Sequence, residues 1–152
     1  MTILKQTTTY YLDEKDYEVA NVYADLYSKT VVQFVNHRKH AITALKDLAY
    51  EFFINGLLRN AQRYYLMVKD HYGITALNDK DLLSLAEIQE KLNHHDEALE
   101  NYHRILRFYP HSHHLQETYK GISRICEICG NRTKAEFFKS MFDTEILPAK
   151  KV

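Results

Sequence analysis

Two cysteines close together are the residues whose types and spacing point most directly to chemistry. Cys126 and Cys129 stand in the stretch ICEICGN, and a C-x-x-C pair can bind zinc or cycle as a redox couple. A structural zinc site needs a second pair of ligands at a defined spacing, and none stands out in this sequence. Similar residue types recur along this chain every 37 residues, and in this repeat Cys126 falls at a position that points into a packed helix interface. Cysteine behaves there as a small apolar residue. We therefore expect both cysteines to be structural.

Nine histidines are the other group that could bind a metal. They cluster in two turns, one with His94 and His95 and one with His111, His113 and His114. Two such turns could hold a transition metal weakly if they approached each other. Loop histidines without cysteine or carboxylate support are usually solvated, so the sequence predicts neither a metal nor another cofactor.

Motifs for catalysis are missing from the sequence. The four glycines, Gly56, Gly73, Gly121 and Gly130, are scattered, so no glycine-rich loop can cradle a phosphate. Neither G-x-S-x-G nor H-E-x-x-H occurs, and no acidic pair is marked as a buried acid–base couple. We expect this protein not to be an enzyme.

The amino-acid composition indicates which kinds of partner this protein can bind. The chain has 152 residues, 45% of them hydrophobic and 26% charged, with 20 basic and 20 acidic side chains. This balance lacks the positive charge that typifies nucleic-acid binding, and no apolar run is long enough to cross a bilayer. The start, MTILKQTTTYYLDEKD, does not resemble a signal peptide. The sequence therefore predicts a cytoplasmic protein with no nucleic-acid partner and no membrane insertion.

A repeat of 37 residues organises most of the chain. Ala61, Ala98 and Ala135 are separated by this constant interval. Similar residue types recur before each alanine, in the registers Leu45, Leu82 and Tyr119; Leu48, Leu85 and Ile122; Ala49, Ala86 and Ser123; and Gly56, Asn93 and Gly130. A fixed period of this length predicts a solenoid of helix pairs. The predicted repeats cover about residues 42–78, 79–115 and 116–148.

Each repeat reads as two helices joined by a tight turn. In the second repeat, Asn78 or Asp79 can cap the first helix, and Asn93 stands where a left-handed residue would end it. The second helix starts near Asp96 and stops before Pro110. The small residues at the repeated positions predict close approach of the two helix backbones.

Residues 1–40 do not follow the repeat. We expect a loosely ordered segment over residues 1–12 and an amphipathic helix over residues 13–40. The helix has an apolar seam made of Tyr17, Ala20, Ala24, Tyr27, Val31 and Phe34. This seam either caps the first repeat or forms a homodimer through Tyr17, Tyr27 and Phe34, and Val22, Tyr23 and Leu26 widen it.

The repeated marks resemble the tetratricopeptide repeat, with its leucines and small residue on the first helix, small turn residue, alanine and aromatic on the second helix, and closing proline. The middle repeat is the best match, and the period of 37 departs from the family's usual value of about 34. The resemblance implies an all-α fold in which three helix pairs form a short right-handed solenoid. It also implies a function in binding proteins.

The resemblance further implies a concave groove lined by the first helix of each pair. The residues between packing positions there are Lys46, Tyr50, Phe53, Lys80, Leu83, Glu87, Glu90, Lys120 and Arg124. The alternative is an ordinary solvated face. Tyr50, Phe53 and Leu83 favour capture of a peptide, because hairpin packing does not require apolar groups at these positions.

Two groups of tetratricopeptide proteins match this sequence to different degrees. Heat-shock co-chaperones of this fold bind a terminal carboxylate with a clamp of basic and asparagine residues, of which this chain matches only Lys46. The stretch LAYEFFINGLLRNAQRYY, residues 48–65, looks like the first repeat of the class II translocator chaperones of type III secretion. That resemblance implies a chaperone or adaptor that holds a secreted protein or peptide client. The alternative function is a structural subunit built permanently into a larger assembly.

Overall fold

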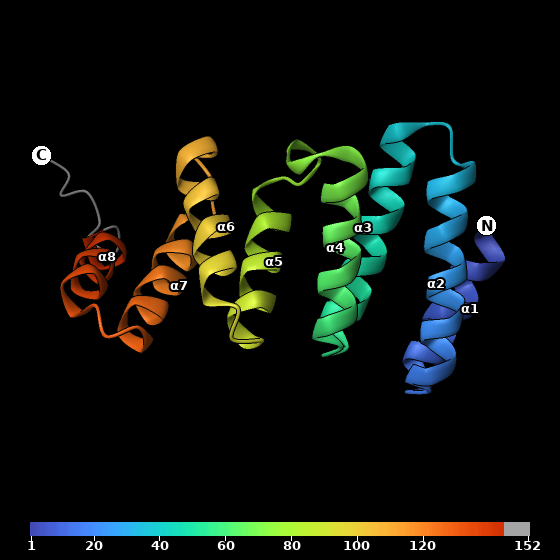
Figure 1. Ribbon diagram of the computed structural model, residues 1–152, viewed down its shortest axis with the longest axis horizontal. Helices are drawn as coiled ribbons and strands as arrows, with labels where there is room; N and C mark the ends of the chain where they lie inside the picture. Colours follow the sequence, from blue (N-terminus) through green and yellow to red (C-terminus); the bar gives the residue numbers. More distant parts are fainter. Residues whose placement is uncertain (145–152) are drawn as a thin grey trace, which may run out of the picture. The chain divides into compact units, whose positions relative to one another are not determined.

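The computed structural model describes residues 1–144, in which α-helices are joined by turns and short loops without any β-strand. The chain divides into two compact units, Met1–Leu77 and Asn78–Val152. The first unit contains α1 (Thr2–Asp13), α2 (Tyr17–Phe34), α3 (Arg38–Ile54), α4 (Leu58–Tyr72) and the 3-10 helix η1 (Ile74–Ala76). The second contains α5 (Asp79–Lys91), α6 (His95–Phe108), α7 (Leu115–Ile128) and α8 (Arg132–Thr144) (Figure 1). The predicted all-α class is confirmed.

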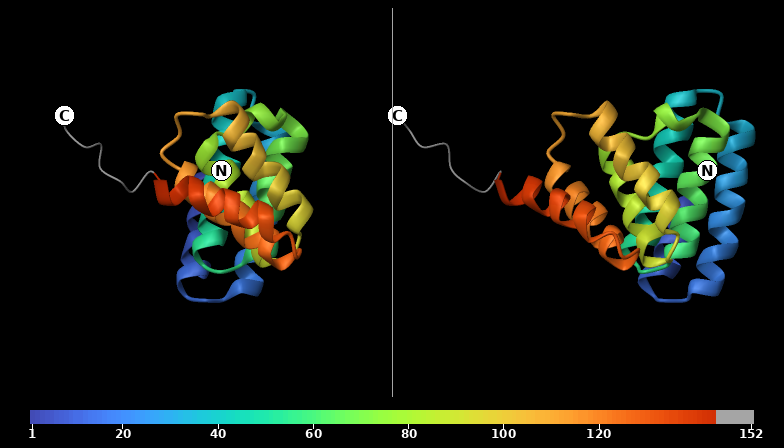
Figure 2. Two further views of the ribbon diagram at one scale, coloured as in Figure 1. Left: turned by 90° about the vertical axis from the view of Figure 1, so that its left-hand side faces the viewer. Right: turned by 60° about the vertical axis from the view of Figure 1, so that its left-hand side comes forward.

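Within each unit, the helices pack most extensively as consecutive pairs. These pairs are α1 with α2, α3 with α4, α5 with α6, and α7 with α8. A tight turn joins the two helices of every pair (Figure 2). The end of the predicted third repeat, including Pro148, lies outside the described residues.

All four turns inside the pairs have the same backbone geometry. Each contains one residue with positive φ, namely Lys15, Gly56, Asn93 and Gly130. The next backbone N–H donates to the carbonyl five residues earlier, over 2.8–2.9 Å, in the bonds from Asp16 to Tyr11, Leu57 to Phe52, His94 to Gln89, and Asn131 to Cys126. This is the Schellman ending of a helix. The left-handed positions predicted at Gly56, Asn93 and Gly130 are therefore confirmed.

A buried alanine follows each turn by five residues. These alanines are Ala20, Ala61, Ala98 and Ala135, and none is more than 2% exposed. A larger side chain at this position would separate the two helices of the pair, because protein cores are close-packed. The shared turn and alanine show that the N-terminal pair is built like the other three.

The prediction for residues 1–40 was wrong in two respects. The segment expected to be loosely ordered forms α1, and the single helix expected over residues 13–40 is α2, which ends at Phe34. This pair does not follow the 37-residue repeat, because Ala20 stands 41 residues before Ala61. In addition, Lys15 occupies the turn position that glycine or asparagine holds in the other pairs. The threonines of α1 weaken its intrinsic helix propensity. Two of their hydroxyls are satisfied within the helix, where Thr8 Oγ1 donates to the Leu4 carbonyl at 2.8 Å and Thr9 Oγ1 donates to the Lys5 carbonyl at 3.2 Å.

Polar contacts join the two helix pairs of the first unit. Between the first helices α1 and α3, Lys5 Nζ donates to Asp47 at 3.2 Å, and Thr9 Oγ1 donates to Glu51 at 2.9 Å. Between the second helices α2 and α4, Asn60 donates to Asn21 at 2.8 Å.

The same α2–α4 interface contains a second polar group. Tyr64 Oη donates to Asp25 at 3.0 Å, and Arg63 forms an ion pair with the same carboxylate. Side chains of like helices therefore join the two pairs, while the most extensive backbone contact between the pairs is that of α2 with α3.

Close packing of α6 against α7 fixes the second unit. Gly121 lies in the middle of α7, and an added Cβ there would overlap the ring of Tyr102 on α6. Both residues are buried, so the ring has no free space into which to move. Glycine normally weakens a helix by about 1 kcal/mol relative to alanine. Here it permits a backbone approach that alanine would prevent.

We predict that Gly121→Ala lowers the stability of the protein, although alanine favours helix formation. The overlap with Tyr102 should cost about 1–3 kcal/mol, which exceeds the gain in helix propensity. Urea unfolding followed by circular dichroism measures the change. In a Tyr102→Ala background the ring is absent, so the same substitution should be neutral or stabilising. Equal destabilisation in both backgrounds would contradict the assigned contact.

Candidate functional site

The α5 and α7 helices of the second unit bring together residues that the sequence placed on one binding face. The start of α5 is fixed by a capping box, in which the Asn78 side chain accepts from the Asp81 N–H at 2.9 Å and Asp81 accepts from the Asn78 N–H at 3.0 Å. The predicted cap at Asn78 is therefore confirmed. The apolar face of α5 packs on α6, and α7 packs on α6 and α8. Glu87 and Glu90 then project from α5, and Arg124 projects from α7.

Glu90 is the link between three helices. Its two carboxylate oxygens accept from Arg124, with Nε to Oε1 at 2.7 Å and Nη2 to Oε2 at 2.9 Å. Oε2 also accepts from the Tyr102 hydroxyl at 2.9 Å. Burial opposes ionisation of Glu90, but these hydrogen bonds outweigh it and lower the pKa of the carboxyl. Glu90 is thus a charged, fully engaged structural group.

Glu87 lies one turn earlier on α5 and has the opposite character. Its side chain is half-buried, and no hydrogen bond or ion pair joins it to another residue of the described chain. Burial raises the pKa of this carboxyl, and the negative charges of Glu90 and Glu117 add to the effect, while Lys91 and Arg124 oppose it. Keeping Glu87 ionised at neutral pH therefore costs folding free energy.

A cavity of about 280 Å³ is lined by these side chains, namely Glu87, Glu90, Lys91 and Arg124. Lys91 is exposed, and Glu87 and Glu90 are partly buried, so the wall of the cavity is polar and charged. Glu90 and Arg124 already neutralise each other, and Lys91 and Arg124 act on Glu87 through their charge without a hydrogen bond to it, so Glu87 is the carboxylate of this wall that can still accept a hydrogen bond. The arrangement suits binding of a side chain.

The other groove residues of the second unit have different exposure. Lys80 is exposed near the start of α5, and Lys120 is partly buried on α7. Leu83 was expected to offer an exposed apolar group, but it is only 8% exposed and belongs to the core. The stretch from Asp81 to Ala86 is buried at every position, so α5 is enclosed on more faces than an amphipathic helix would be. Leu83 therefore offers little surface to a partner.

Three groove residues lie on α3 in the first unit. Tyr50 is 41% exposed, while Lys46 and Phe53 are partly buried. Their spacing places them along one face of α3, as the sequence predicted. A patch that joins Tyr50 and Phe53 to residues of the second unit stays a prediction.

The residues predicted to form a dimer seam separate into different environments. Tyr27 is only 4% exposed and is buried among charged groups of α1 and α3 that include Lys5 and Asp47. It is therefore part of the core of the first unit and cannot also contact a second copy. Tyr17 is partly buried, and Phe34 at the end of α2 is exposed. The inward seam of α2 thus acts within the unit, where α2 packs chiefly on α1 and less on α3.

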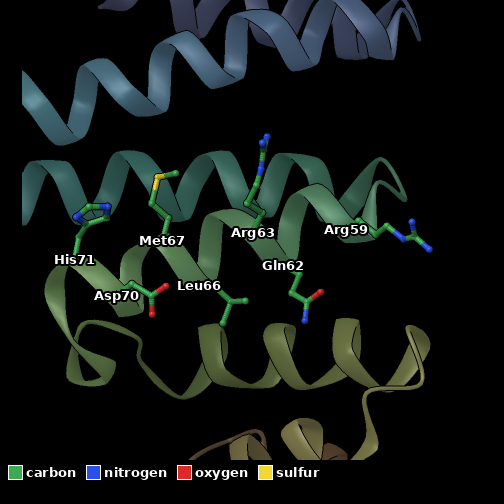
Figure 3. Close-up of a pocket in the computed structure, with 7 residues that line it drawn as sticks. All are labelled: Arg59, Gln62, Arg63, Leu66, Met67, Asp70 and His71. Carbon is green, nitrogen blue, oxygen red and sulfur yellow. The ribbon is translucent and has the colours of Figure 1, made fainter.

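A larger cavity, of about 420 Å³, lies along α4 and was not predicted. Figure 3 shows Arg63, Met67 and His71 on one side of α4, Gln62, Leu66 and Asp70 on the other, and Arg59 near its start. Their spacing of three and four residues indicates a common helix surface, but the tetratricopeptide resemblance implies a groove lined by the first helix of each pair, whereas α4 is a second helix. Arg63 is already paired with Asp25 and lies over the Tyr64 ring, so this cation is not available to bind an anion.

The two cysteines differ in exposure. Cys126 is buried, as the repeat register predicted, and Cys129 is exposed at the end of α7. Burial raises the pKa of the Cys126 thiol, the neighbouring Cys129 adds to this rise, and Lys134 opposes it. A thiol with a raised pKa is a poor nucleophile. Among the described residues, no three histidine, cysteine or acidic side chains are grouped so that they could hold a metal ion.

Comparison with known proteins adds no assignment. No protein-family model matches the sequence, and no curated protein is significantly similar to it. Across the described helices, none combines the length and the apolar character needed to span a membrane.

We predict that Glu87→Gln stabilises the protein at pH 7 and has little effect at pH 4. The pKa of Glu87 is raised above its ordinary value of 4.5. The cost of its charge is therefore absent below that value and grows as pH rises through the folded-state pKa. Thermal unfolding from pH 4 to pH 8 measures this difference.

The control is Glu90→Gln, which should behave in the opposite way. The lowered pKa of Glu90 means that its charge stabilises the fold above pH 4.5 and that this contribution is lost as pH falls. Loss of stability in both variants at pH 7 would show that Glu87 is as well satisfied as Glu90.

Proposed function

We propose that this protein is a non-enzymatic chaperone or adaptor that binds a segment of a client protein. The observation that carries the proposal is Glu87, a half-buried carboxylate without a hydrogen bond in the described structure, at the wall of a charged cavity. Residues that cost stability are commonly retained at functional sites. The mixed charges around Glu87 suit recognition of a polar side chain.

The architecture that we propose is a short right-handed solenoid of tetratricopeptide type. Its support is the repeated turn with one left-handed residue, followed in each case by a buried alanine. In such a solenoid the first helices form the binding face, which matches the positions of Tyr50 on α3, Glu87 on α5 and Arg124 on α7. Solenoid surfaces of this kind bind extended segments of other proteins.

We further propose a cytoplasmic location and a secreted protein as the client. The support is the similarity of residues 48–65 to the first repeat of class II translocator chaperones of type III secretion. Within this stretch, α3 carries Tyr50 and Phe53, and α4 begins at Leu58.

The second candidate function is a structural subunit assembled permanently with other proteins. It is favoured by large apolar side chains that are more than half exposed in both units, including Ile54, Ile128 and Phe137. Such groups are often covered in stable complexes. A chaperone should remain monodisperse and folded when purified without its client, whereas a permanent subunit should aggregate or require its partner.

We predict that Glu87→Gln removes binding of peptides that carry lysine or arginine and leaves other binding unchanged. An array of 15-residue peptides, varied in charge and apolar content, is probed with wild-type protein and the variant. The control is Glu127→Gln on the exposed face of α7, which removes the same charge outside the cavity. Identical binding patterns for wild type and Glu87→Gln would exclude the cavity as a client site.

We also predict that replacing Tyr50 and Phe53 together by alanine weakens client binding. Losing an aromatic anchor can cost about 2 kcal/mol or more, so affinity should fall by at least roughly 30-fold. Fluorescence titration of the best array peptide measures the loss, and circular dichroism checks that the fold is retained. Ile54→Ala is the matched control, because Ile54 is exposed on the same helix but does not belong to the predicted set of groove residues. Unchanged affinity in a folded double variant would place the binding face elsewhere.

A further inference from the structure

One face of α2 carries a stripe of exposed residues that the fold of the first unit does not use. The stripe consists of Glu18, Val22, Leu26 and Lys29, whose spacings of four, four and three residues align them along the helix. Val22 is 68% exposed and Leu26 is 50% exposed. Glu18 and Lys29 are exposed at the two ends of the stripe.

The other faces of α2 are already occupied. One face is buried in the unit through Ala20, Ala24, Tyr27 and Val31. A second face contacts α4, where Asn21 accepts from Asn60 and Asp25 accepts from Tyr64 and Arg63. The stripe is therefore the remaining face of α2, and its centre is apolar.

In the next helix pair, α4 is equivalent to α2, and its residues at the equivalent positions contact a neighbouring helix. Matching Ala20 of α2 to Ala61 of α4 pairs Val22 with Arg63 and Val19 with Asn60. On α4, Arg63 and Asn60 attach their helix to the preceding one, α2, by polar contacts. In this register, Val22 of the stripe stands where α4 presents Arg63, which docks on another helix. The stripe thus lies on a helix-stacking face.

The order of residues in the stripe indicates which molecule could bind to it. The midpoint of Glu18 and Lys29 lies between Tyr23 and Ala24, and that of Val22 and Leu26 lies at Ala24. The two midpoints differ by half a residue, or about 0.8 Å along the helix. A single two-fold axis near Ala24 can therefore serve both pairs of residues.

We propose that this stripe binds the same stripe of a second copy, with the two α2 helices antiparallel about a two-fold axis. Val22 of each copy then packs against Leu26 of the other, and Glu18 of each copy lies opposite Lys29 of the other. A parallel arrangement would instead place Glu18 against Glu18 and Lys29 against Lys29. Closed two-fold dimers are the commonest soluble oligomers because one patch completes itself. This inference is independent of the proposed client site.

The test is charge reversal with rescue, read as molar mass by sedimentation equilibrium over a range of protein concentrations. The wild type should reach twice the chain mass of 18.0 kDa. Glu18→Lys and Lys29→Glu should each weaken the dimer, because each variant creates two like-charge contacts across the axis. The double variant Glu18→Lys with Lys29→Glu restores both attractive contacts and should dimerise like the wild type.

A second variant tests the apolar centre. Val22→Lys with Leu26→Lys should give a folded monomer, whereas Ile54→Lys, on the exposed face of α3, should leave the dimer intact. A wild type that is monomeric at 200 μM would overturn the proposal. Failure of the charge-reversed double variant to recover, with the single variants weakened, would also overturn it and indicate a different protein as the occupant. A dimer that survives the two lysines would place the contact elsewhere on the chain.

Discussion

The carboxylate of Glu90 joins three of the four helices described in the second unit. It belongs to α5, accepts from Tyr102 on α6 and accepts two hydrogen bonds from Arg124 on α7. Tyr102 is held by this bond while its ring closes on the backbone of Gly121. A charge-assisted, bidentate contact is stronger and more directional than an ordinary surface ion pair. This one group therefore ties α5 to both α6 and α7 at the wall of the cavity, beside the close contact of Tyr102 with Gly121.

Glu87 and Glu90 show how local hydrogen bonding decides the role of a residue type. They stand on the same helix, within one turn, and both are partly buried. Two donors lower the pKa of Glu90, whereas burial without a donor raises the pKa of Glu87. The first stabilises the fold and the second opposes it. This carboxylate lines the cavity and accepts no hydrogen bond from the described residues.

The sequence predicted the parts of the fold that depend on local backbone chemistry. Gly56, Asn93 and Gly130 marked helix ends because few other residues adopt positive φ at low cost. The same rule concealed the N-terminal pair, since Lys15 adopts that conformation without belonging to the favoured residue types. Its threonine-rich first helix is supported by contacts such as Thr9 with Glu51, which are 42 residues apart and leave no local pattern.

The candidate site was predictable only as a list of residues. Helical spacing placed Glu87 and Arg124 on first helices, but their roles depend on which charges meet across helices. Arg124 pairs with Glu90, 34 residues away, and leaves Glu87 without a hydrogen-bonding partner in the described structure. Burial also depends on the whole fold. Leu83 and Tyr27 have ordinary positions in their helices, yet both are enclosed by neighbours that periodicity does not identify.

The two proposed surfaces differ in chemistry and lie in different compact units. The cavity at Glu87 is charged and selects a polar group, whereas the stripe on α2 is apolar at its centre and selects a copy of itself. Substitutions at one surface should therefore leave the other intact. A two-fold dimer would present two cavities to one client, and a second binding event would then be intramolecular. For a flexible client segment of suitable length, the effective concentration for that event reaches about the millimolar range. Two weak sites joined in this way can retain an unfolded client that neither site would hold alone.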